Sequence, residues 1–97
     1  MVKHIVLWTL KEDEKKNSGK IVEDLNRRFH ALLGVVDGLT GIECGDNFAG
    51  GNYNLALYSE FTSKEALDHY QNHPAHVAIK EIIHQLVCGR ECVDYEV

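Results

Sequence analysis

The sequence lacks the features that mark membrane proteins and nucleic-acid-binding proteins. No hydrophobic run approaches the roughly 20 residues that a membrane-spanning helix needs. Ten basic residues stand against fifteen acidic ones, for a formal net charge of −5, and no basic stripe extends beyond Lys15-Lys16 and Arg27-Arg28. We therefore expect neither nucleic acid nor a membrane as a partner. The stretch 2–8 is too short and too strand-like for a signal peptide, so we expect a cytoplasmic protein.

Cysteine is scarce as well. Cys44, Cys88 and Cys92 are odd in number and match no zinc-finger or redox spacing, as is typical of a reducing compartment. We expect them to pack as small hydrophobic residues.

Motifs for metal and cofactor binding are also missing. His69 and His73 lie four residues apart, but the H-E-x-x-H pattern and a third ligand are missing. No haem or flavin motif is present, so we expect no metal site and no cofactor.

The single proline, Pro74, predicts a break between two helices. Proline has no N–H and a fixed φ, so it should end the helix that begins near Thr62 and start another, with His73 as the N-cap. His76 then falls in the first turn of the second helix, where the helix dipole keeps the imidazole neutral. A neutral imidazole beside the phenol of Tyr70 can move a proton. The segment around this break is therefore the predicted functional site.

Hydrophobic periodicity predicts the other elements of secondary structure. Strands are expected over residues 2–10, 39–48, 53–61 and 91–97. The first strand is apolar on both faces and should be central. An amphipathic helix should begin at a cap formed by Asn17 or Ser18 and end at Gly34. A capping box with Thr62 at the cap should open the helix pair, and Gly89 should close it.

The order strand, helix, strand, strand, helix pair, strand predicts the fold. With right-handed crossovers it gives an α+β, ferredoxin-like βαββαβ domain over residues 1–97, with a four-stranded antiparallel sheet and helices on one face. Ile5, Leu7, Ala56 and Tyr58 should point to the open face. Apolar patches of this size seldom stay exposed on a monomer. A second copy is the simplest cover, so we expect a homodimer through the open sheet face.

Four segments, in register, resemble the stress-responsive dimeric α/β-barrel (Dabb) domain family. They are Val2–Val6, Phe61–Leu67, His73–His76 and Val93–Tyr95. The resemblance implies that two ferredoxin-like protomers form a dimeric α/β barrel, with a pocket between sheet and helices in each protomer. It also implies roles for three residues: the catalytic tyrosine and histidine of a plant polyketide cyclase in this family correspond to Tyr70 and His76, and its first-strand histidine to His4.

Three functions are open at this point. The first is a stress-responsive protein whose mostly apolar pocket binds a small apolar or carbonyl-type molecule. The second is a cofactor-independent lyase or cyclase, with His76 as general base and Tyr70 as donor to the developing oxyanion. The third is a structural dimer with a collapsed pocket, in which both side chains only pack. Strand parity and the resemblance predict the substrate-binding residues His4, Val6, Trp8, Phe29 and Leu57.

Overall fold

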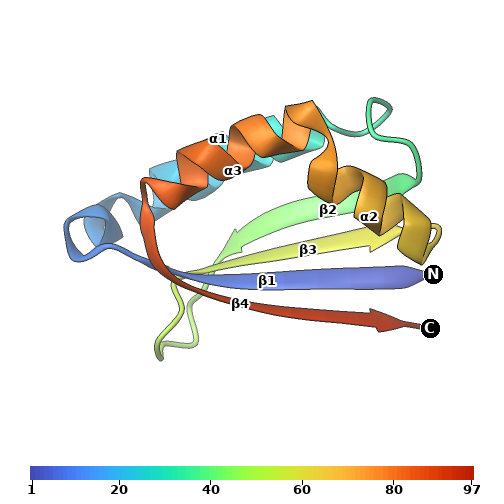
Figure 1. The fold of residues 1–97 in the computed structure, drawn as a ribbon. Helices are drawn as coiled ribbons and strands as arrows, with labels where there is room; N and C mark the ends of the chain where they lie inside the picture. The colour runs from blue at the N-terminus through green and yellow to red at the C-terminus, as the bar shows by residue number, and fades with distance from the viewer.

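A four-stranded antiparallel sheet carries helices on one face only (Figure 1). The computed structural model describes all residues, 1–97. The strands are β1 (Val2–Leu10), β2 (Leu39–Asp46), β3 (Leu55–Phe61) and β4 (Val87–Glu96), in the spatial order β2-β3-β1-β4. The helices are the 3₁₀ helix η1 (Glu12–Asn17), then α1 (Ser18–His30), α2 (Lys64–Asn72) and α3 (Pro74–His84). The predicted ferredoxin-like βαββαβ fold is confirmed. No helix has the length and hydrophobicity needed to cross a membrane.

Strand β1 is the central strand, as its two apolar faces predict. It pairs with β3 on one side and with β4 on the other, both antiparallel. Every second side chain, beginning at Val2, is buried toward the helices, and the intervening ones are half-buried. Residues His4, Val6 and Trp8 therefore lie beneath the helices, with Leu57 of β3 beside Val6. This row of side chains forms the floor of the site described below.

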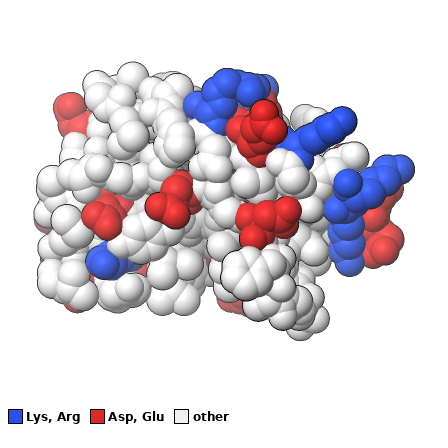
Figure 2. Space-filling model, turned by 180° about the vertical axis from the view of Figure 1, so that it is seen from behind, with Lys and Arg blue, Asp and Glu red and all other residues white.

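The face of the sheet opposite the helices is apolar at its centre. Ile5 pairs with Tyr58 on one side and with Val93 on the other, and Leu7 pairs with Ala56. Val93 is 56% exposed. These pairings place the predicted apolar residues on the open face. In a view from behind, most basic side chains lie toward one end of the molecule and acidic ones are scattered (Figure 2).

Helix α1 ends earlier than its hydrophobic periodicity predicts. Its last residue is His30, and a turn follows before Gly34, which has a φ of +84°. Leu32 is buried from this turn rather than from the helix. Helix α1 is preceded by η1, and its N-cap residue, Asn17, makes no side-chain capping bond. The turn after α1 thus buries Leu32, which the hydrophobic periodicity assigns to a further turn of the helix.

The hairpin between β2 and β3 is longer than predicted. Strand β2 ends at Asp46, and Phe48, expected to alternate into the core, is fully exposed. Asn47 organises the loop: its side chain donates to the carbonyl oxygens of Gly50 and Tyr53 and accepts from the Ala49 N–H. These local bonds replace the strand ladder, as asparagine side chains commonly do in turns.

Two helix boundaries also differ from the prediction. Ser63, not Thr62, caps α2, and its hydroxyl accepts a bond from the Ala66 N–H at 3.1 Å. The helix pair ends at His84, and Gly89 lies inside β4 opposite Thr9 rather than closing the helix. A Cβ at Gly89 would lie 3.2 Å from the Thr9 hydroxyl oxygen, so this glycine allows the two strands to approach. Strand β4 consequently begins four residues earlier than predicted, at Val87 rather than at residue 91.

Candidate functional site

The site is organised by the predicted helix break. Helix α2 ends at Asn72 and α3 begins at Pro74, so the break is confirmed. His73 between them is extended, with φ −69° and ψ 132°, and its Nδ1 accepts a bond from the Ala75 N–H at 3.1 Å. Proline has no backbone N–H to donate. At the first helical position this costs nothing, because the N–H there would have no acceptor within the helix. The break turns α3 so that its first turn packs against the last turn of α2.

Tyr70 and His76 are stacked across this break. Their ring centroids lie 3.9 Å apart with an interplanar angle of 23°. His76 Nδ1 lies 3.1 Å from the backbone carbonyl oxygen of Tyr70. Because a carbonyl can only accept, Nδ1 carries the proton and donates, which leaves Nε2 as a free acceptor. The two side chains are thus in contact, but through ring faces rather than through a hydrogen bond between hydroxyl and imidazole.

The imidazole of His76 is neutral at physiological pH. The side chain is only 6% exposed. Burial is the main cause that lowers its pKa from the ordinary 6.5 to about 4, and the positive charge of Lys80 lowers it further. The sequence predicts a neutral ring on the basis of the helix dipole, whereas burial is the dominant cause in the structure.

The hydroxyl of Tyr70 is the one buried polar side-chain atom without a hydrogen-bond partner. Tyr70 is 0% exposed and packs edge or tilted against His4 and Phe61, with centroid distances of 6.1 and 5.0 Å. Burial raises the pKa of the phenol well above its usual value of 10, so it stays a protonated donor. An unpaired buried hydroxyl is destabilising by about 1–3 kcal/mol. The Tyr70 hydroxyl is therefore a hydrogen-bond donor that has no acceptor within the protein.

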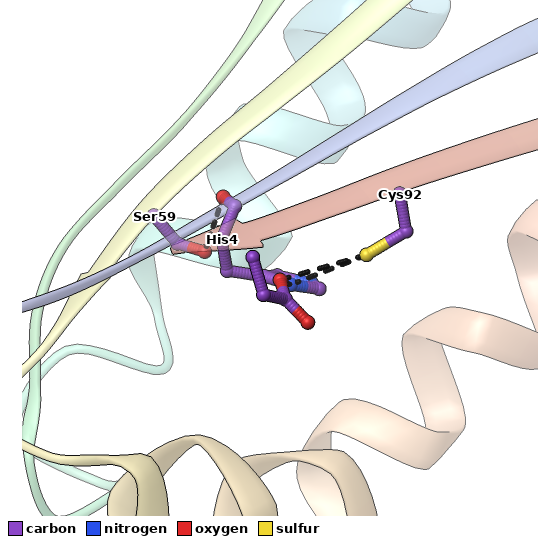
Figure 3. A network of polar contacts seen from close by, with 4 residues as sticks. His4, Ser59 and Cys92 are labelled. Atoms are coloured by element: carbon purple, nitrogen blue, oxygen red, sulfur yellow. Dashed lines mark hydrogen bonds and ion pairs between the residues drawn. The ribbon is translucent and has the colours of Figure 1, made fainter. Parts of the chain in front are cut away.

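His4 is held in place by polar contacts on three sides. It is buried on β1, and its Nδ1 forms a hydrogen bond with the carboxylate of Asp94 on β4. The Ser59 hydroxyl donates to the backbone oxygen of His4 at 3.2 Å, and Cys92 Sγ lies 3.6 Å from Nδ1 (Figure 3). The sequence predicts Cys92 only as a small hydrophobic packing residue and predicts no role for Asp94, whereas the Cys92 sulfur contacts the polar atoms of both His4 and Asp94. The antiparallel register, which pairs His4 with Asp94, is the signal that could have found them.

A cavity of about 340 Å³ lies between the sheet and the α2–α3 break. It has fourteen lining residues, of which seven are hydrophobic. Lining residues that the sequence analysis named are His4, Val6, Trp8, Leu57, Tyr70 and His76. Phe29 is not among them: it is fully buried in the core beneath α1, so its expected contact with a ligand is wrong for this cavity. The collapsed pocket of the third function would leave no such volume.

The remaining lining residues make the cavity electropositive. They are Gln71, Lys80, Ile83, His84, Val87, Cys88, Gly89 and Arg90. No aspartate or glutamate lines the cavity. Lys80 and Arg90 therefore bring two positive charges without a compensating carboxylate in the lining, an arrangement that favours an anionic ligand. Sequence reasoning missed the residues of the 87–90 stretch because it placed the start of the last strand after them.

The other histidine pair offers no comparable site. His69 and His73 have ring centroids 5.5 Å apart. His73 Nδ1 is already engaged by the Ala75 N–H. Neither residue lines the cavity.

Comparisons with known proteins agree with this fold. The model of the Stress responsive A/B Barrel Domain (Dabb) family matches residues 2–97. A Bacteroides fragilis crystal structure, described as a dimeric protein of unknown function with a ferredoxin-like fold, is 36% identical, with a TM-score of 0.85 over 99% of this chain and 95% of that one. An Arabidopsis thaliana structure is 27% identical, with a TM-score of 0.82 over 100% of this chain and 95% of that one. An uncharacterized protein of Streptomyces coelicolor is 30% identical over 80% of this chain and 81% of its own length.

Proposed function

The chain belongs to the Stress responsive A/B Barrel Domain family, and on that premise we propose that it is a homodimer in which each protomer binds a small anionic carbonyl compound between sheet and helices. This proposal rests on three features that one cavity brings together: an unpartnered phenol, a free imidazole nitrogen, and two cations in a lining that contains no carboxylate. The sequence predicts a small apolar or carbonyl-type ligand. The two cations in the lining add the expectation that this ligand is negatively charged.

Self-association is supported by the open face of the sheet. Ile5, Tyr58 and Val93 form a row across three strands on the face that carries no helix, where the Lys3 ammonium lies 5.6 Å from the centre of the Tyr58 ring. The 36% identical Bacteroides fragilis protein is described as dimeric. Packing two such faces together removes apolar surface from water at about 25 cal/mol per Å². A two-fold dimer brings the same face of both chains into the interface.

Ligand recognition follows from the polar groups in the cavity. A carbonyl or enolate oxygen near Tyr70 would accept the bond that its hydroxyl lacks. A ligand hydroxyl would donate to Nε2 of His76. The side chains of Lys80 and Arg90 would attract a carboxylate toward the rim, and Val6, Trp8 and Ile83 supply apolar walls for a ring or chain. A few polar groups in a mainly apolar pocket are the usual design of a small-molecule site.

The low basicity of His76 favours a binding function over acid/base catalysis. A general base works best when its pKa lies near the working pH. The imidazole has a pKa of about 4, so it is fully unprotonated at pH 7 but a weak base. A bound carboxylate would raise this pKa, and acid/base catalysis therefore depends on the ligand itself.

The second candidate is a cyclase or lyase that uses Tyr70 and His76 for proton transfer. The presence of both side chains in one cavity favours it, as does the resemblance to olivetolic acid cyclase at the segment His73-Pro74-Ala75-His76. His76 Nε2 would remove a proton from the carbon next to a carbonyl, and the Tyr70 hydroxyl would donate to the developing oxyanion. The stacked geometry positions the two groups through ring contact, without a bond between them.

The binding proposal is tested with 4-acetylbenzoate, which carries a ketone and a carboxylate, and with its neutral methyl ester. We expect calorimetry to detect the acid and to find the ester at least tenfold weaker. Lys80→Gln should reduce the difference between acid and ester, whereas Lys16→Gln, a surface cation outside the cavity, should not. Equal affinity for acid and ester in the native protein would contradict the electrostatic part of the proposal.

The enzymatic alternative is tested with a linear β-polyketide thioester. His76→Ala should lower the rate by about 10²–10⁴, the usual contribution of general acid/base catalysis. The dimer should stay intact, because His76 lies in the cavity and not on the open face. Product formation at the same rate in the native protein, the variant and buffer would remove this alternative and leave the binding proposal untouched.

A further inference from the structure

A cluster of three potential metal ligands lies beside the cavity, where β1 and β4 pair. One ligand atom each from His4, Cys92 and Asp94 lies within 4.8 Å of the others. The three residues come from opposite ends of the chain: Cys92 and Asp94 follow His4 by 88 and 90 positions. No spacing motif could therefore have indicated the cluster. Antiparallel pairing of His4 with Asp94 and of Val6 with Cys92 brings them to one face of the sheet.

We propose that His4 Nδ1, Cys92 Sγ and Asp94 Oδ1 bind a divalent metal ion of the zinc class. Zinc takes nitrogen, thiolate and carboxylate ligands at about 2.0–2.3 Å, and a tetrahedron with such bonds has sulfur-to-nitrogen and sulfur-to-oxygen edges of about 3.5 Å. The corresponding distances are 3.6 Å from Cys92 Sγ to His4 Nδ1 and 3.5 Å from Cys92 Sγ to Asp94 Oδ1. Two of the three edges of the ligand triangle therefore already have the required length.

The third edge, between His4 and Asp94, is closed by a hydrogen bond. A metal ion would replace the shared proton, and the two groups must separate to the roughly 3.3 Å edge of a tetrahedron with nitrogen and oxygen bonds. Asp94 can make this movement because its side chain is 39% exposed, whereas the His4 side chain is buried, at 3% exposure. Figure 3 shows the sulfur of Cys92 directed toward the His4 ring.

The ligand set selects the kind of ion. Magnesium and calcium prefer oxygen ligands alone, whereas imidazole and thiolate favour zinc, cobalt and cadmium. Three protein ligands leave a fourth position for water, as in zinc sites that are not closed. The thiol of Cys92 is protonated before the ion arrives, so binding should release one proton from sulfur as the metal–thiolate bond forms.

The test uses the full-length protein in its reduced form, with Co²⁺ and Zn²⁺ as probes. Co²⁺ should produce a thiolate-to-cobalt charge-transfer band with one ion per protomer, and Zn²⁺ should displace it. Cys92→Ser should remove the band and lower Zn²⁺ affinity at least tenfold, and Asp94→Asn should lower it as well. Cys88→Ser removes an exposed thiol that lies outside the cluster and should leave both readouts unchanged.

Two results would overturn the proposal. A cobalt complex without a thiolate band means that Cys92 is not a ligand. Zn²⁺ affinity that is unchanged in Cys92→Ser but lost in His69→Gln assigns the ion to the His69 and His73 pair instead. Circular dichroism of each variant establishes that it is folded, and both substitutions at the cluster concern side chains that are at least partly exposed. The outcome is independent of whether the cavity binds 4-acetylbenzoate.

Discussion

Replacing Tyr70 by phenylalanine should stabilise the protein and weaken its ligand binding. The hydroxyl of Tyr70 is buried without a partner, and such a group is destabilising by about 1–3 kcal/mol. Phenylalanine keeps the ring and hence the stack on His76 at 3.9 Å and the contact with Phe61 at 5.0 Å. We therefore expect Tyr70→Phe to raise the free energy of unfolding by about 1 kcal/mol or more. For a domain of this size that corresponds to an increase in Tm of roughly 4–8 °C.

The assay is urea denaturation at pH 7 and fixed protein concentration, followed by calorimetry with 4-acetylbenzoate. A lost hydrogen bond to a ligand carbonyl should lower affinity about tenfold, which corresponds to about 1.4 kcal/mol. Tyr53→Phe is the matched control, because Tyr53 lies in the hairpin loop and outside this cavity. A Tyr70→Phe variant that is less stable than the native protein, with unchanged ligand affinity, would refute the reasoning, since the hydroxyl would then have a partner within the fold.

Three other changes test separate parts of the structure. Because the folded-state pKa of His76 is about 4 and its ordinary value is 6.5, the unfolded chain binds more protons between these values, and stability should fall by up to about 3 kcal/mol as pH decreases from 6.5 to 4. His76→Asn should show less of this loss in urea titrations. Leu7→Glu places a charge on the open face and should halve the mass in light scattering or cause aggregation. Gly38→Ala should be much more destabilising than Gly34→Ala in thermal unfolding. Both glycines have a φ of +84°, but of the two only a Cβ at Gly38 would collide with a neighbour, the Cβ of Ala66.

Each of these predictions has an outcome that would contradict it. An identical pH profile for the native protein and His76→Asn would mean that this imidazole is not the group that stays neutral on folding. An unchanged dimer mass in Leu7→Glu would place the interface elsewhere, and Lys16→Glu on η1 serves as the control for added negative charge. Equal losses of stability at the two glycines would show that the chain near Ala66 relaxes to admit a methyl group.

The sequence was sufficient to predict the elements whose signals are local. Alternation along residues 2–10 identifies a strand with both faces covered, and Pro74 has a backbone chemistry that forces the helix break where it occurs. The approximate positions of Tyr70 and His76 follow from that break. By contrast, the end of α1 and the start of β4 depend on tertiary contacts. The end of β2 depends on the side-chain bonds of Asn47 to Ala49, Gly50 and Tyr53 within its own loop, which strand periodicity does not encode.

The composition of the site was less predictable than the fold. Lys80 and Arg90 enter the cavity because α3 and β4 converge there, which no periodicity encodes. Phe29 has the right character for a pocket residue, but α1 directs it into the core. The contact between His4 and Asp94 depends on the register of two strands separated by most of the chain. Burial of the Tyr70 hydroxyl without a partner likewise emerges only from the packed structure.

The most direct test of the central claim is an NMR titration that observes the ring nitrogens of the six histidines while 4-acetylbenzoate is added. His4, His76 and His84 line the cavity, whereas His30 and His69 do not and provide internal controls. If a ligand binds between sheet and helices, the signal of His76 Nε2 should shift with saturation, accompanied by His4, and the controls should stay fixed. Shifts confined to the histidines outside the cavity, or none at all up to millimolar probe, would contradict the account.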